Sequence, residues 1–291
     1  MLKHRLITGP ILSLGIIGLL VLDNSLATSA FPDSSTVKAG IILTILAVLI
    51  APIAAIEFGA IADGLGIRSC IPTIALTLIA WIAFFYYLPD SKSGTSTVAI
   101  ASSILIASFF LSIVSIAKSK TLSGIIAGAA YSTMTATYLG LAFGFLLLIR
   151  KEHDALWILS IIAIVKMCDT GAFFTGCSIG KHKLIPWISP GKTWEGLVGG
   201  VITASLTAML LASLNNCYLQ NEPTIPLAFA AIFGLILGFF GQCGDLVMSI
   251  FKRDSGLKDS SAVLPGLGGI LDVLDSLILT SPIAYWLFHL L

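Results

Sequence analysis

The sequence predicts an all-α, polytopic integral membrane protein, and two observations support this class. Of its 291 residues, 57% are hydrophobic and only 11% are charged, whereas soluble globular domains carry about 25% charged residues. Apolar stretches long enough to cross a hydrocarbon core of roughly 30 Å recur along the whole chain. A transmembrane barrel would need alternating strands of about ten residues. Because the apolar stretches here are continuous, we expect helices.

The lengths of the apolar stretches predict about nine transmembrane helices, joined by short polar links. The first stretch resembles a signal peptide, but no clear cleavage site follows it, so we interpret it as the first span. We expect N-terminal transmembrane helices over residues 1–120 and a transmembrane catalytic region over residues 121–291. The expected spans are 6–22, 39–61, 71–88, 97–117, 122–149, 155–175, 194–214, 226–250 and 265–289.

Basic residues predict the orientation, because lysine and arginine accumulate on the cytoplasmic side of membrane proteins. With the N-terminus inside and nine alternating spans, 11 of the 16 basic residues fall inside. The outer loops hold few, among them Arg150. This bias predicts a multi-pass protein of the inner (cytoplasmic) membrane with its N-terminus inside. It also puts two polar loops, 176–193 and 251–264, on the cytoplasmic face.

The cysteines and histidines do not form a recognisable metal motif. The five cysteines are an odd set without a CxxC pair, so we interpret them as packing residues rather than disulfide or zinc ligands. His182 and His289 have no partner at ligand spacing. The "GKT" at 191–193 is not a P-loop, because Pro186 stands where that motif requires its first glycine.

Acidic residues in the late spans are the main functional clue. At a span centre each carboxylate costs about 2.5–3.5 kcal/mol, so an ion, basic partners or water must compensate. Helical spacing gives Asp272 and Asp275 a common face, joins Asp245 to Ser249 and Lys252 in one stripe, and pairs Lys166 with Asp169. Such a set suits Mg²⁺, which binds one or two carboxylates together with substrate phosphates.

Two alternatives stay open for these charges. They could pair with one another and join helices without forming a site. For Glu57, alone in the second span, a packing role and a site role are equally compatible with the sequence.

The two polar loops supply positive charge of the kind that phosphates require. Lys252, Arg253 and Lys258 alternate with acids at 254 and 259, which membrane topology alone would not require. In the other loop, Gly176 and Gly180 allow close backbone approach beside several lysines. The seventh span begins there, and its N-terminal dipole end favours a nearby anion.

Residues 249–275 resemble the signature of the phosphatidate cytidylyltransferases, which reads S-x-x-K-R, four residues, K-D, and then P-x-H-G-G-x-x-D-R-x-D. An upstream block from Asp169 to Gly196 also resembles this family. Two positions depart from the pattern: Leu267 stands at the usual histidine and Val273 at the usual arginine. Because the acids and the K-R and K-D pairs are intact, we expect both departures to be tolerated. The matching residues are Ser249, Lys252, Arg253, Lys258, Asp259, Pro265, Gly268, Gly269, Asp272 and Asp275.

The resemblance implies a transfer of CMP from CTP to phosphatidate, which gives CDP-diacylglycerol and pyrophosphate. For this reaction we expect Asp245 and Asp272 to hold Mg²⁺, with Asp169 and Asp275 in direct contact with it or one shell further out. A second, monovalent cation stays open. The implied catalytic residues are Asp169, Asp245, Asp272, Asp275 and Lys252. The implied substrate-binding residues are Ser189, Lys192, Thr193, Ser249, Arg253, Lys258 and Asp259.

The implied partners are CTP, phosphatidate and membrane lipids, without nucleic acid, and runs of small residues are compatible with a homodimer. Three other functions stay open. They are an ion-coupled transporter, a catalytically inactive relative, and an enzyme that uses another lipid phosphate as acceptor.

Overall fold

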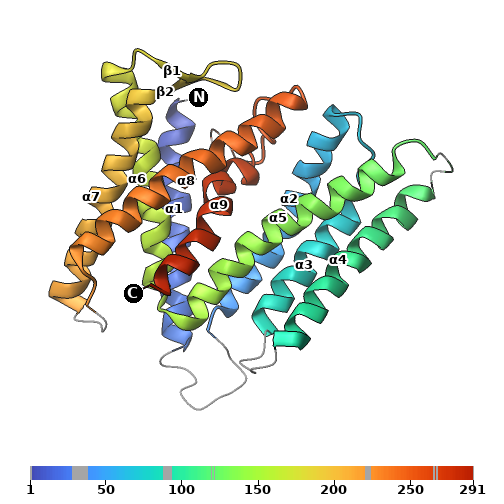
Figure 1. The fold of residues 1–291 in the computed structure, drawn as a ribbon, viewed down its shortest axis with the longest axis horizontal. Coiled ribbons are helices and arrows are strands. Elements are labelled where there is room, and N and C mark those ends of the chain that lie inside the picture. Colours follow the sequence, from blue (N-terminus) through green and yellow to red (C-terminus); the bar gives the residue numbers. More distant parts are fainter. Residues whose placement is uncertain are drawn as a thin grey trace. The chain divides into compact units, whose positions relative to one another are not determined.

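The helices of the computed structural model confirm the all-α class (Figure 1). The structure describes residues 2–27, 39–87, 94–118, 120, 122–219, 224–264, 266 and 268–290. The helices are α1 (Leu2–Ser25), α2 (Ile41–Gly64), α3 (Ile71–Tyr87), α4 (Gly94–Ala117), α5 (Ile125–Glu152), α6 (Ala155–Ile179), α7 (Trp194–Leu214), α8 (Leu227–Asp254) and α9 (Ile270–Phe288). A two-stranded hairpin, β1 (Lys183–Ile185) and β2 (Ser189–Thr193), and a π-helical turn, η2 (Asn215–Leu219), complete the described elements.

Most of these helices have the length and apolar character of membrane spans. Within the described part of the chain, seven helices meet both criteria. They are α2, α4 (counted from Ser96), α5, α6, α7 (continued to Cys217), α8 and α9. Gly9–Ser25 and Ile71–Tyr87 are apolar but shorter. A multi-pass membrane protein is therefore confirmed as the class, whereas the predicted number of nine spans is not.

The chain folds as two compact units. Unit 1 comprises Met1–Ala155 and Phe251–Val273, and unit 2 comprises Leu156–Ile250 and Leu274–Leu291. Unit 1 thus holds α1 to α5, the last turn of α8, the loop that follows it and the first turn of α9. Unit 2 holds α6, the hairpin, α7 and most of α8 and α9. The predicted functional division at residue 120 stays a prediction.

In unit 1, helix α3 packs against α2, α4 and α5 (Figure 1). Gly140 and Gly144, one turn apart on α5, face Trp81 and Phe85, which are one turn apart on α3. A Cβ atom on either glycine would collide with the facing aromatic side chain. Close approach at small residues is typical of membrane helices, because association there depends on van der Waals packing.

A buried ion pair joins α1 to α5 within unit 1. The carboxylate of Asp23 lies 2.6 Å from Nε of Arg150, and the side chains are 0% and 4% exposed. The same carboxylate accepts hydrogen bonds from the backbone N–H groups of Gly40 and Ile42 at the start of α2, where an anion complements the helix dipole. Arg150 is therefore a buried structural partner in α5, not a loop charge as the sequence suggests.

The polar segment over residues 176–193 contains more regular secondary structure than the sequence predicts. Helix α6 continues to Ile179, and β1 then pairs antiparallel with β2, with Lys183 opposite Thr193. Strands this short, one of them holding proline and glycine, carry little periodic signal. The hydroxyl of Thr193 accepts a hydrogen bond from the backbone N–H of Gly196, which caps α7 at its predicted first residue.

The segment over residues 251–264 also begins as helix. Helix α8 continues through Asp254, so Lys252 and Arg253 lie on its last turn. Gly256 has φ 74°, and backbone hydrogen bonds run from Gly256 to Arg253 and from Leu257 to Lys252. This pattern is a Schellman motif, in which a left-handed glycine ends the helix.

Candidate active site

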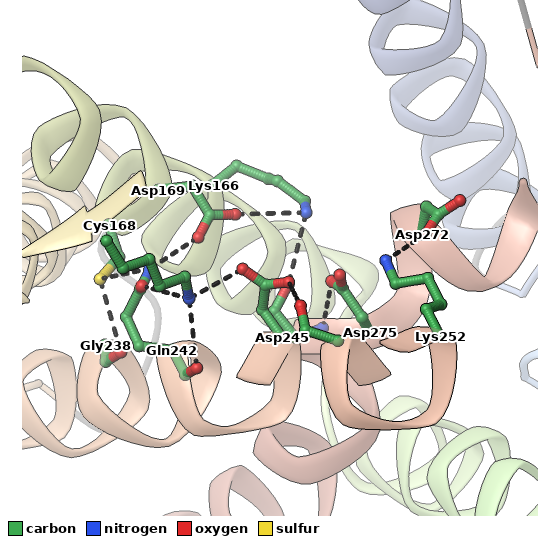
Figure 2. Close-up of polar contacts among 12 residues, drawn as sticks. Lys166, Cys168, Asp169, Gly238, Gln242, Asp245, Lys252, Asp272 and Asp275 are labelled. Atoms are coloured by element: carbon green, nitrogen blue, oxygen red, sulfur yellow. Dashed lines mark hydrogen bonds and ion pairs between the residues drawn. The ribbon is translucent and has the colours of Figure 1, made fainter. Parts of the chain in front are cut away.

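A chain of polar side chains joins three elements of unit 2 (Figure 2). Nζ of Lys192, on β2, lies 2.8 Å from Oδ2 of Asp245 on α8, and it donates a 2.8 Å hydrogen bond to Oε1 of Gln242. Nε2 of Gln242 in turn donates to Oδ1 of Asp169, on α6, at 2.8 Å. Gln242 thus fixes a lysine and an aspartate that come from different elements.

Helix α9 adds two further groups to this cluster in unit 2. Nζ of Lys166 lies 3.4 Å from Oδ2 of Asp169 and 3.3 Å from Oγ of Ser276. Asp275 is buried, and its carboxyl group interacts with that of Asp245. Two neighbouring carboxylates repel each other when both are ionised. Their proximity therefore favours a cation beside them.

The cluster lies at the edge of a cavity of about 530 Å³, within the usual range of about 300–1,000 Å³ for small-molecule sites. Gly176 and Gly180 line it, as close backbone approach requires, and the hairpin forms part of its wall. The polar lining residues are Asp169, Lys183, Ser189, Lys192, Thr193, Gln242 and Asp245. A cavity with positive and negative side chains on its wall can hold an anionic ligand together with a cation.

A second contact attaches the hairpin to α7. Nδ1 of His182 lies 2.6 Å from Oε1 of Glu195, and the backbone N–H of His182 also donates to this carboxylate. Because the hairpin carries Lys183, Ser189 and Lys192, this contact supports the cavity wall.

Asp272 belongs to unit 1 and has a different set of partners there. Its Oδ1 lies 2.5 Å from Nζ of Lys252 (Figure 2). Its Oδ2 accepts hydrogen bonds from the N–H of Ser260 at 2.9 Å and from the N–H of Gly269 at 2.8 Å, and it lies 2.9 Å from the hydroxyl oxygen of Ser260. Asp272 is the third residue of α9, so its bond back to the N–H of Gly269 is one half of a capping box; Gly269 has no side chain to supply the other half.

Comparison with known proteins decides the family. Residues 25–291 match the cytidylyltransferase family. The chain belongs to this family. A phosphatidate cytidylyltransferase of Bacillus subtilis (strain 168) is 38% identical over 162 residues, which cover 55% of this chain and 58% of the relative.

Two further relatives show the same partial coverage. A phosphatidate cytidylyltransferase of Haemophilus influenzae is 40% identical over 140 residues, or 48% of each chain. The uncharacterized protein YnbB of Escherichia coli (strain K12) is 43% identical over 135 residues, 46% of this chain and 43% of the relative. The chain therefore spans about half the length of the curated relatives it matches.

The remaining predicted site residues lie in both units. In unit 2, Oγ of Ser249 lies 3.4 Å from Oδ1 of Asp245. In unit 1, the side chains of Arg253, Lys258 and Asp259 are exposed. Leu267 and Pro265 lie outside the described residues.

Sequence reasoning missed Gln242 as a site residue. The available signal was an amide three residues before Asp245 within an otherwise apolar helix, but spacing alone does not reveal that it bridges Asp169 and Lys192.

The donor set of unit 2 fits Mg²⁺ in part. This ion takes one or two carboxylates and completes its shell with water and substrate phosphate, and the neighbouring Asp245 and Asp275 supply such a pair. Among the described residues, no three His, Cys, Asp or Glu side chains form a metal-binding group. The oxygens of Asp272 already have three donors of their own, which are Nζ of Lys252 and the N–H groups of Ser260 and Gly269, so its assignment as a ligand stays a prediction.

Proposed function

We propose that this cytidylyltransferase transfers CMP from CTP to phosphatidate, with CDP-diacylglycerol and pyrophosphate as products. The observation that carries the proposal is the cavity of unit 2, whose wall combines Lys183 and Lys192 with Asp169 and Asp245. Relatives named phosphatidate cytidylyltransferase support the choice of substrates. The apolar helices support a lipid acceptor, because such a substrate reaches the protein from the bilayer.

The proposed reaction joins two polyanions. An oxygen of the phosphatidate phosphate bonds to the α-phosphorus of CTP, and the bond from that phosphorus to the pyrophosphate oxygen breaks. Catalysis of such a transfer is mainly positioning and charge neutralisation. In this proposal Lys192 and Lys183 hold phosphate oxygens at the cavity wall, and Gln242 and Asp169 keep Lys192 in place. The lipid phosphate is already ionised near neutral pH, so no general base is required.

We further propose that Asp245, with Asp275 beside it, holds Mg²⁺. When bound, this ion neutralises negative charge on the phosphates of CTP. Asp272 and Lys252 remain proposed catalytic residues. Ser189, Thr193, Ser249, Arg253, Lys258 and Asp259 remain proposed substrate contacts. The site is proposed to open to the cytoplasm in the inner membrane, with the N-terminus inside. A homodimer and a second, monovalent cation stay predictions.

The proposal is tested with purified protein in lipid nanodiscs, CTP labelled at the α-phosphate, and phosphatidate. We expect label in CDP-diacylglycerol when Mg²⁺ is present and no labelled lipid when it is chelated. Label only with a polyprenyl phosphate would indicate a different acceptor, and label with no lipid phosphate tried would indicate an inactive relative. Ion flux into proteoliposomes without any nucleotidyl transfer would indicate a transporter.

A further inference from the structure

Glu57, on α2, is a buried carboxylate that the proposed reaction does not use. Its residue is 1% exposed, and four donors in unit 1 surround it. Oε1 accepts from Oγ of Ser261 at 2.7 Å and from the N–H of Ile270 at 2.8 Å. Oε2 accepts from Oγ of Ser260 and from the N–H of Leu271, both at 2.9 Å. Each oxygen therefore binds one hydroxyl of the α8–α9 loop and one backbone amide of α9.

These bonds compensate the burial of the charge. Hydrogen bonds to an ionised group are roughly twice as strong as neutral ones, and the first turn of a helix favours an anion because its N–H groups lack partners within the helix. Glu57 thereby satisfies two of these amides, at Ile270 and Leu271. A side chain from a distant helix thus takes the place of a local cap.

Ser260 connects Glu57 to the proposed catalytic residues of unit 1. Its hydroxyl lies 2.9 Å from a carboxylate oxygen of Glu57 and 2.9 Å from one of Asp272. Asp272 in turn binds Nζ of Lys252. One continuous polar network therefore runs from α2 through the loop to the first turn of α9 and the last turn of α8.

Gly269 shows that the backbone is shaped around this carboxylate. A Cβ atom at this position would lie 2.6 Å from both carboxylate oxygens of Glu57 and would collide with the hydroxyl of Ser260. Only a glycine leaves room for the carboxylate to reach the amides of α9.

We propose that Glu57 is a positioning residue for CMP transfer, which keeps Asp272 and Lys252 in place by holding the α8–α9 loop and the first turn of α9. The inference rests on the proposed function. Glu57 does not itself contact substrate in this proposal, because its oxygens are occupied by four donors and its side chain is buried.

The test compares Glu57→Gln with Asp63→Asn, which removes an exposed acid from the same helix. The glutamine keeps the shape of Glu57. Its N–H₂ group, however, is itself a hydrogen-bond donor and would face two of the four donors that bind the carboxylate. We expect faster amide hydrogen exchange in residues 255–264 and 268–271, with unchanged exchange in α3 to α5. Because a displacement of about 1 Å can reduce a rate on the order of 100-fold, we expect kcat to fall by about that factor, with KM for CTP little changed. Asp63→Asn should match the wild type in both measurements.

Ser261→Ala keeps the inference testable if Glu57→Gln does not fold. This substitution removes one hydroxyl donor to Glu57. Compared with Glu57→Gln, we expect a smaller increase in amide hydrogen exchange of the loop and a smaller decrease in kcat. The inference is wrong if loop exchange stays at the wild-type rate, if kcat is unchanged although the loop exchanges faster, or if exchange accelerates throughout α3 to α5. A wild type without CMP transfer would refute the proposed function. The exchange experiment would then still decide whether Glu57 holds the loop.

Discussion

The ammonium group of Lys192 lies 2.8 Å from the carboxylate of Asp245 and joins the hairpin to helix α8 in unit 2. The two side chains are 18% and 30% exposed, so they are accessible from the cavity but less screened than a surface pair. Because Asp245 also neighbours Asp275, one ion pair brings together the proposed phosphate-binding cation and the proposed metal-binding anion.

Asp245→Ala is expected to abolish CDP-diacylglycerol formation even with excess Mg²⁺. The change removes a proposed metal ligand and leaves Lys192 without its carboxylate partner. The measurement is transfer of labelled CMP in membranes and with purified protein. Asp63→Asn is the control for loss of an acid elsewhere. Near-normal turnover by Asp245→Ala would refute the assignment of Asp245 as a metal ligand.

Lys192→Met is expected to lower kcat/KM for CTP on the order of 100-fold, because losing one preorganised charge contact to the transition state typically has an effect of that size. Lys192→Arg keeps the charge but cannot keep the geometry to Gln242 and Asp245, so we expect an intermediate value. Steady-state kinetics with varied CTP provides the measurement. If Lys192→Met retained the wild-type kcat/KM, the cavity would not be the nucleotide site.

Arg150→Met is expected to reduce the free energy of unfolding by about 3–5 kcal/mol, because it leaves the buried carboxylate of Asp23 without its charge partner. The combined variant Asp23→Leu and Arg150→Met should be less destabilised than the sum of the two single changes. Unfolding of the detergent-solubilised protein measures both. If the losses in free energy of unfolding of the two single variants simply added up in the double variant, Asp23 and Arg150 would have no energetic coupling.

Leu267→His restores the residue that the family usually carries at this position. Since we expect the wild type to be active, the substitution should change kcat only a few-fold. Turnover of labelled CTP by the two proteins provides the measurement, and Val273→Arg extends it to the second departure. A silent wild type that Leu267→His switches on would show that the departure is not tolerated.

The amino-acid sequence by itself determined the class of the protein and most helix boundaries. Hydropathy and segment length are local properties, and a span must be apolar over its own length regardless of its neighbours. The predicted span 194–214 coincides with α7, and Gly256 ends α8 through its own backbone conformation. Lys166 and Asp169, three residues apart, do meet as their spacing predicts.

Only the tertiary structure decided the partners of the charged residues. It paired Lys192 with Asp245, inserted Gln242 between Asp169 and Lys192, buried Arg150 against Asp23, and directed Glu57 to the start of α9. Each of these contacts joins segments far apart in the chain. Because helical periodicity specifies which face a side chain occupies but not which helix faces it, partners of this kind follow from packing.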